Sequence, residues 1–203
     1  MLFETALELQ RTSFAEMATA ATILDKIQST LLFFEMHAAN EDAHILPLIG
    51  IKDISLSTAF ESEHEEDTVL SARLEALMQG IRLTESVTER IMLGKKLMHT
   101  YMDFIAFNLK HMEREEALLN KLLWLHFTVE ELLETERSIV SAIPPEKSAE
   151  IIPWMVRNLN QEELQHWLRD VKQNAPAPVF RNLCAIAGDE LPALQWSSLS
   201  QEI

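Results

Sequence analysis

The chain has 203 residues and a formal net charge of −15, with 17 Lys and Arg against 32 Asp and Glu. This balance argues against a nucleic-acid partner, because binding to phosphates requires clustered basic residues. The single cysteine, Cys184, cannot form an internal disulfide, so a reducing cytoplasm is the expected location. No apolar run reaches membrane-spanning length.

The composition predicts an all-α fold. Hydrophobic residues make up 47% of the chain, enough for a sizeable core, and only 4 residues are glycine and one is tyrosine. Leu, Ala, Glu and Met are abundant, and all four favour helices. The acidic residues near the start of the chain are not typical of a signal peptide.

The first predicted helix covers about residues 2–17, and the second covers about residues 22–46. Pro47 and Gly50 are expected to end the second helix. The apolar stripe of the second helix advances in steps of three and four residues, which is typical of one helix face. It consists of Leu24, Ile27, Leu31, Phe34, His37, Glu41, His44 and Leu48.

The third predicted helix covers about residues 55–78, and the fourth extends to about residue 123. Ser86 and Glu89 form a capping-box pattern at the start of the fourth helix. The third stripe is Phe60, His64, Asp67, Ser71, Leu74 and Met78; the fourth is Leu97, Tyr101, Phe104, Asn108, His111, Glu115, Leu118 and Leu122. Four helices with short connections predict an antiparallel four-helix bundle over residues 1–125.

Shorter helices are predicted for residues 126–203. Thr128 and Glu131 form a second capping-box pattern, and Asn160 is a further N-cap candidate. The prolines at 144–145 and 176–178 are expected at helix starts, where the missing N–H matters least. Nothing resembles a flexible linker, so this helical extension is expected to dock on the bundle.

Ionisable residues interrupt the apolar stripes of three predicted helices. A buried ionisable group is costly unless it is paired or bound to a cation. Two helices share a His-x-x-x-Glu spacing, which places both side chains on one face. Imidazole and carboxylate ligands together suit iron, zinc or manganese. The candidate metal ligands are His37, Glu41, His64, His111 and Glu115, with His44, Glu61 and Asp67 as secondary candidates.

Other histidines show how easily such spacings arise. His99 and His111 are twelve residues apart, which at about 100° per residue places them about 120° apart around the helix. His111 lies seven residues after Phe104 and is therefore predicted to face the core, whereas His99 is predicted to be peripheral. His126 and His166 are expected at the boundary of the two parts and at the surface.

The height of two candidate ligands along the bundle argues against a shared site. In an ideal hairpin that turns between Gly80 and Val87, His64 and His111 would differ in height by roughly 12 Å. A metal site therefore requires either that the third helix extends further or that residues 80–90 climb back along the bundle.

Three segments resemble the hemerythrin-like family. "HAANEDAHILP" is similar to its pattern H-x-x-x-E-E-x-x-L-F-P, "ESEHEED" to its third-helix segment and "FNLKHMEREEALLN" to its fourth-helix H-x-x-x-E-E. The order and spacing agree over about residues 1–123. "LNKLLW", "IPPEK" and "APAPVF" resemble the C-terminal extension of a bacterial group of hemerythrin-domain proteins.

The resemblance implies a four-helix bundle with a non-heme di-iron centre that binds or senses dioxygen, nitric oxide or iron. It implies His37, His64 and His111 as imidazole ligands and Glu41 and Glu115 as bridging carboxylates.

The chain also departs from the pattern. No histidine precedes His37, with Glu4 and Glu8 the nearest substitutes, and Thr68 stands where oxygen carriers have a second third-helix histidine. A sensor, an iron-binding module, a one-metal site and a degenerate site stay open.

Three functions compete. The first is a metal-binding protein that binds or senses a small ligand or oxygen species. The second is an enzyme on the same scaffold that uses iron in peroxide, nitric oxide or repair chemistry; it ranks lower because the sequence offers no separate acid–base or nucleophile set. The third is a metal-free helical interaction protein with a degenerate site. A homo-oligomer stays open, and no membrane partner is expected.

Overall fold

The computed structural model describes the backbone of residues 1–203 and every side chain except those of Pro145 and Glu146. This described backbone holds eleven α-helices, one π-helical turn and no strand, which confirms the all-α prediction. It forms two compact units, Met1–Val140 and Ser141–Ile203. The predicted boundary near residue 125 precedes α7 (Val129–Ala142), most of which belongs to the first unit.

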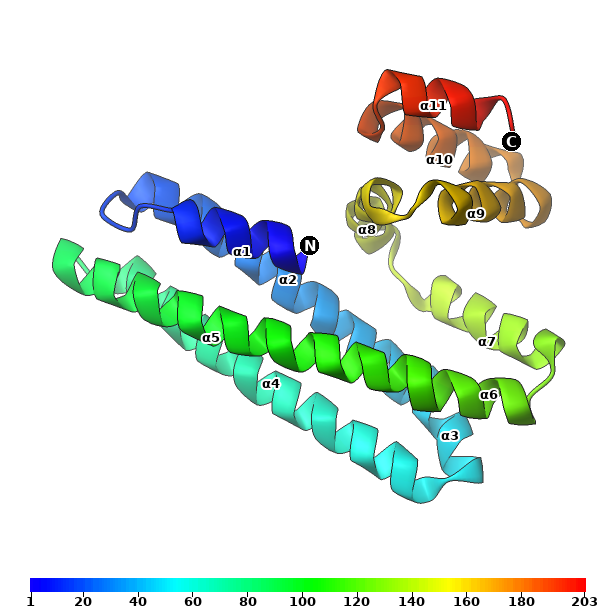
Figure 1. Ribbon diagram of the computed structural model, residues 1–203, viewed down its shortest axis with the longest axis horizontal. Helices are drawn as coiled ribbons and strands as arrows, with labels where there is room; N and C mark the ends of the chain where they lie inside the picture. Colours follow the sequence, from blue (N-terminus) through cyan, green and yellow to red (C-terminus); the bar gives the residue numbers. More distant parts are fainter. The chain divides into compact units, whose positions relative to one another are not determined.

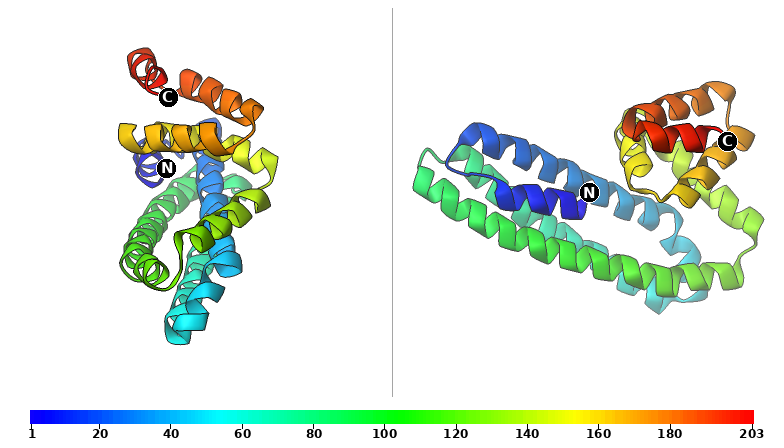
Figure 2. Two further views of the ribbon diagram at one scale, coloured as in Figure 1. Left: turned by 90° about the vertical axis from the view of Figure 1, so that its right-hand side faces the viewer. Right: turned by 45° about the horizontal axis from the view of Figure 1, so that its top comes forward.

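The first unit is built from three long helices and several short ones (Figure 1). They are α1 (Leu2–Arg11), α2 (Met17–His44), α3 (Leu46–Lys52), α4 (Ile54–Leu83), α5 (Val87–Arg114), the π-turn η1 (Glu115–Leu119) and α6 (Asn120–His126). α4 packs along α5, α2 packs on α4, and α1 packs on both α2 and α5. Figure 2 shows that α1 accompanies only the part of α2 and α5 near the α4–α5 turn.

α4 is longer than the sequence predicted. It continues through Gly80 to Leu83, and α5 begins one short turn later at Val87. A glycine inside a helix costs about 1 kcal/mol, but Met78 and Ile81 on either side of it are fully buried. Their burial outweighs that cost, so the third helix extends further, which supplies part of the height that the metal interpretation required.

The loop after α1 is anchored, which explains why α1 ends early and α2 begins early. Arg90 donates from Nε to the Phe14 carbonyl at 2.8 Å and from Nη2 to the Ala15 carbonyl at 3.0 Å. The Phe14 ring lies against Gly94, where a Cβ would approach it to 2.3 Å. Residues 12–16 therefore form a fixed loop instead of the last turns of the first predicted helix.

Pro47 does not simply end the second predicted helix. α2 ends at His44, and Pro47 occupies the first turn of the short helix α3, where a proline is well tolerated. α3 then redirects the chain from α2 into α4, which Asp53 caps by accepting from the Leu56 amide at 3.0 Å.

The apolar stripe of the fourth predicted helix shifts by one residue at η1. Leu119 is 1% exposed and Leu123 is 6% exposed, whereas Leu118, a predicted core residue, is 40% exposed. A π-turn contains more residues than an α-turn, so the inward face moves one position along the chain after Glu115. Leu122 is accordingly only partly buried.

The second unit consists of α8 (Pro145–Asn158), α9 (Gln161–Asn174), α10 (Ala177–Glu190) and α11 (Ala193–Ser200). The predicted helix starts are confirmed: Thr128 and Glu131 cap α7 reciprocally, and Asn160 and Glu163 form a complete capping box on α9. The sequence did not predict α11. This unit has its own core, formed by Val156, Leu164, Leu168, Leu183, Ala187, Leu191 and Leu199. Among the described residues, no helix is both long and apolar enough to cross a membrane.

Candidate metal centre

Three helices and the π-turn bring the five main candidate ligands together. α2 contributes His37 and Glu41, α4 contributes His64, α5 contributes His111, and Glu115 is the first residue of η1. His64, His111 and Glu115 are buried. The side chain of His37 is 31% exposed and that of Glu41 is 14% exposed, so the cluster opens toward solvent beside His37.

All three histidines direct Nε2 at the two carboxylates. His37 Nε2 lies 3.4 Å from Glu41 Oε1 and 3.6 Å from Glu115 Oε2. His64 Nε2 lies 3.3 Å from Glu41 Oε2, and His111 Nε2 lies 2.6 Å from Glu115 Oε1. Each carboxylate thus spans two histidines from different helices. One ligand atom from each of Glu41, His64, His111 and Glu115 lies within 4.8 Å of the other three.

Four polar atoms in this cluster have only ion-pair contacts with the part of the protein that the structure describes. His37 Nε2, Glu41 Oε2, His64 Nε2 and Glu115 Oε1 are buried and make no hydrogen bond of acceptable geometry with the described side chains. A buried polar atom with no partner at all costs about 1–3 kcal/mol, and the imidazole–carboxylate contacts here offset part of that cost. The converging group contains Glu41, His64 and Glu115 together with His111, whereas His37 stands outside it. A cation held by that group would bind imidazole nitrogen and carboxylate oxygen, a donor set that suits iron, manganese or zinc.

The outer ring nitrogens of two histidines are held by acidic side chains. His64 Nδ1 lies 2.7 Å from Asp42 Oδ1, and His111 Nδ1 lies 2.8 Å from Glu63 Oε2. Glu63 also forms an ion pair with Arg114. None of the described side chains makes a comparable contact with Nδ1 of His37.

The electrostatics of the cluster favour charge on both partners. Burial lowers the pKa of His37, His64 and His111, but the surrounding carboxylates outweigh it and raise each pKa above 6.5. Burial raises the pKa of Glu115, yet His111 and His37 hold this pKa well below its ordinary range. A metal ion would therefore displace protons from the histidines.

Asp67 is the secondary candidate that lies nearest this cluster. It is buried and accepts a hydrogen bond from Asn108 Nδ2 at 2.7 Å, and the same nitrogen donates to the Phe104 carbonyl at 3.0 Å. Burial raises the pKa of Asp67, although His111, His64 and His37 act to lower it. Asp67 stands outside the group of four atoms that converge.

The other candidates lie elsewhere. Glu61 is exposed and accepts from Ser57 Oγ at 3.3 Å, and His44 is the half-buried last residue of α2. Glu4 and Glu8, the expected first-helix substitutes, both bind Lys26 of α2, at 3.0 and 2.6 Å. His99, His126 and His166 are exposed, so the helical-wheel argument separated His99 from His111 correctly.

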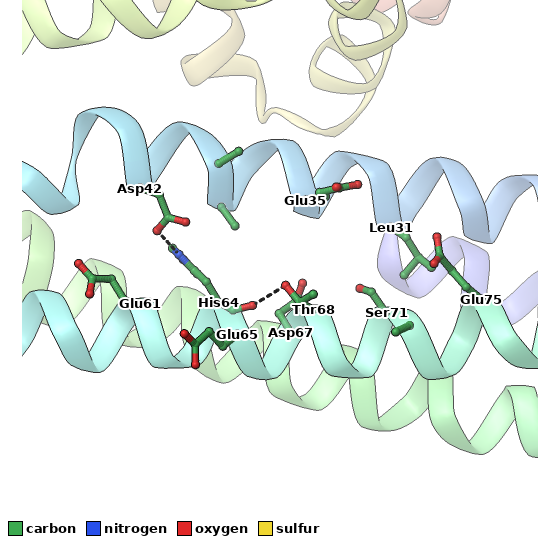
Figure 3. Close-up of a pocket in the computed structure, with 13 residues that line it drawn as sticks. Leu31, Glu35, Asp42, Glu61, His64, Glu65, Asp67, Thr68, Ser71 and Glu75 are labelled. Carbon is green, nitrogen blue, oxygen red and sulfur yellow. Dashed lines mark hydrogen bonds and ion pairs between the residues drawn. The ribbon is translucent and has the colours of Figure 1, made fainter.

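An acidic groove runs between α2 and α4 beside the centre (Figure 3). Its volume is about 670 Å³, and His64 and Asp67 form part of its wall. The remaining polar lining includes Glu35, Asp42, Glu61, Glu65, Thr68, Ser71 and Glu75. The groove gives the centre a negatively charged surround that attracts cations.

Sequence reasoning missed the roles of Asp42, Glu63 and Arg114. Each is a direct chain neighbour of a candidate ligand, and consecutive residues of a helix point in different directions. Asp42 and Glu63 contact histidines of neighbouring helices instead. The only local signal is an acidic residue next to a ligand, which is common in so acidic a chain.

Comparison with known proteins finds distant relatives only. No protein-family model matches the chain, and no solved structure matches it. F-box/LRR-repeat protein 5 of Pongo abelii is 23% identical over 183 residues, 88% of this chain and 26% of that protein. The Mus musculus protein of the same name is 24% identical over 183 residues, which are 88% of this chain and 26% of the mouse protein. The Salmo salar protein of that name is 24% identical over 134 residues, which are 66% of this chain and 18% of the salmon protein. The chain thus spans about a quarter or less of the length of these relatives.

Proposed function

We propose that this chain is a hemerythrin-like metal-binding protein in which α1, α2, α4 and α5 form an antiparallel four-helix bundle around a non-heme iron centre. One observation carries the proposal: one ligand atom each from α2, α4, α5 and η1 lies within 4.8 Å of the other three. Without a metal, the described side chains compensate these atoms only by imidazole–carboxylate contacts of 2.6–3.6 Å, which a cation bound among them would replace.

The proposed histidine ligands differ in how firmly the protein holds their rings. His64 and His111 are buried and their rings are held from both sides, whereas His37 is partly exposed and held from the Nε2 side alone. Glu41 and Glu115 each lie close to two histidines, so these carboxylates would serve as ligands of either one or two metals. When bound, iron would supply Lewis acidity and a coordination position for a small ligand such as dioxygen or nitric oxide.

No first-helix ligand completes this set. α1 packs on α2 and α5, where Glu4 of α1 binds Lys26 and Tyr101 is fully buried. Burial raises the pKa of Tyr101 to about 12. Tyr101 is ten residues before His111, which corresponds to about 15 Å along a helix. The metal next to His37 would therefore take water or an external ligand, which suits sensing or iron exchange better than reversible oxygen transport.

Metal analysis tests the proposal directly. The purified chain, reconstituted with Fe²⁺ under anaerobic conditions and desalted, should retain iron, and a variant with both His64→Ala and His111→Ala should retain at least about tenfold less. The matched control replaces the exposed His99 and His166 with alanine. Retention of no metal by the wild-type chain, or equal retention by the two double variants, would favour the metal-free interaction protein.

A further inference from the structure

We infer that Asp42 and Glu63 are positioning residues that fix the imidazoles of His64 and His111 for metal binding, and that Arg114 in turn holds Glu63. The inference rests on the proposed function. It assigns a role to three side chains outside the ligand set.

The contacts connect the helices in a closed sequence. Asp42 extends from α2 to His64 on α4, and Glu63 extends from α4 to His111 on α5. Glu115, the first residue of η1 directly after α5, lies 3.6 Å from His37 on α2 and closes the sequence. α2, α4 and the continuous segment α5–η1 therefore each supply a histidine and an acidic side chain that contacts the histidine of the next helix.

The chemistry of imidazole explains what these acids do. A neutral imidazole has one N–H and one lone pair, so only one nitrogen can bind a metal. A carboxylate at Nδ1 accepts the Nδ1–H bond, which leaves the lone pair on Nε2. In His64 and His111 it is Nε2 that faces Glu41 and Glu115. The carboxylate also makes the ring a stronger donor to a cation.

The two acids are not equivalent. Asp42 is 49% exposed and lines the acidic groove, where solvent screens its charge (Figure 3). Glu63 is 16% exposed and pairs with Arg114, whose guanidinium lies 5.1 Å from the centre of the Phe60 ring. A buried carboxylate held by a cation is less mobile and less screened. Loss of Glu63 should therefore weaken metal binding more than loss of Asp42.

Titration with Co²⁺ tests this inference on the full chain. Asp42→Asn and Glu63→Gln should each lower the Co²⁺ affinity about 10–100-fold, as replacement of groups that orient metal-bound histidines does. Both should change the visible ligand-field spectrum of the bound ion. The control is Glu66→Gln, which removes the same charge from an exposed position of α4 and should leave affinity and spectrum within about twofold of the wild type.

Each result decides a specific point. If wild-type protein binds Co²⁺ and both variants bind it with unchanged affinity and spectrum, the positioning role is wrong while the proposed function stands. An equal loss in Glu66→Gln would show a general effect of charge and would also overturn the inference. If Glu63→Gln fails to fold by circular dichroism, Asp42→Asn at its half-exposed position decides alone. Absence of Co²⁺ binding by the wild type would instead refute the proposed function.

Discussion

The rings of His64 and His111 lie 5.0 Å apart and edge to face, although an ideal hairpin that turned at Gly80 would separate them in height by roughly 12 Å. Part of the difference arises at the far end of the two helices, where α4 continues past Gly80 to Leu83 and adds about 4.5 Å of height. Each added residue raises the turn by about 1.5 Å relative to His64. A buried Ile81 more than twenty-five residues from His111 thus helps to determine whether the two histidines meet.

Replacing His37 and His111 should have unequal effects on metal content. His37→Ala should empty the more exchangeable position first, because His37 is 31% exposed, whereas His111→Ala should remove the firmly held metal. Iron per chain before and after chelator treatment measures both. Purified wild-type protein should carry substoichiometric or mixed metal. Two irons that survive chelator and both substitutions would show that the ligand set is wrong.

The metal-free protein should lose stability as the pH rises above about 6.5. The folded-state pKa values of His37, His64 and His111 are raised, so these groups stabilise the fold below the unfolded pKa and lose this contribution as pH rises through the folded values. The lowered pKa of Glu115 has the opposite effect on the pH dependence of stability. Its contribution to stability is present at higher pH and is lost as pH falls below about 4.5.

Metal loading should reverse the loss of stability that the metal-free protein shows as pH rises. Metal binds neutral imidazole, so occupancy should fall on acidification and the loaded protein should gain stability as pH rises through the same range. Thermal unfolding midpoints of the two forms between about pH 5 and pH 9 test the opposite slopes. Parallel pH profiles for the two forms would contradict the assignment of these histidines.

Two glycine-to-alanine substitutions should have different effects on the free energy of unfolding. Gly94→Ala places a Cβ 2.3 Å from the Phe14 ring and should reduce the free energy of unfolding by about 1–3 kcal/mol. Gly80→Ala meets only Leu93 Cδ1 at 3.3 Å and should be neutral or stabilising by up to about 1 kcal/mol, because alanine favours the helix. Urea denaturation measures both, and a larger loss for Gly80→Ala would indicate that α4 is interrupted there.

Because of the π-turn, replacing two neighbouring leucines with alanine should lower the free energy of unfolding by unequal amounts. Leu119→Ala should destabilise the fold by about 2–5 kcal/mol, because this side chain is 1% exposed. Leu118→Ala, at 40% exposure, should cost less than about 1 kcal/mol. Chemical denaturation of the pair distinguishes the structure from an uninterrupted α-helix, in which Leu118 would be the buried residue.

Loss of Arg114 should affect both stability and metal. Arg114→Gln leaves the Glu63 carboxylate without its cation and should cost about 1–2 kcal/mol, less than a fully buried pair because Arg114 is 35% exposed. It should also weaken Co²⁺ binding in the same direction as Glu63→Gln. Arg82→Gln, which breaks the exposed pair with Asp25, is the control and should change neither quantity measurably.

The sequence alone predicted the features that depend on local spacing. The helix starts at Ser86, Thr128 and Asn160 follow from capping chemistry within four residues, and each was confirmed. The inward direction of His111 follows from its angle to Phe104 on the same helix. Such relationships are set by helix geometry and need no knowledge of the neighbouring elements.

Only the tertiary structure decided how the helices meet. Glu115 opens a π-turn that moves the core from Leu118 to Leu119, since packing of this segment outweighs regular α-helical hydrogen bonding. Asp42 and Glu63 reach histidines 22 and 48 residues away along the chain. These contacts depend on the relative height and rotation of whole helices, which the burial of residues such as Ile81 and Phe14 determines and which no local pattern encodes.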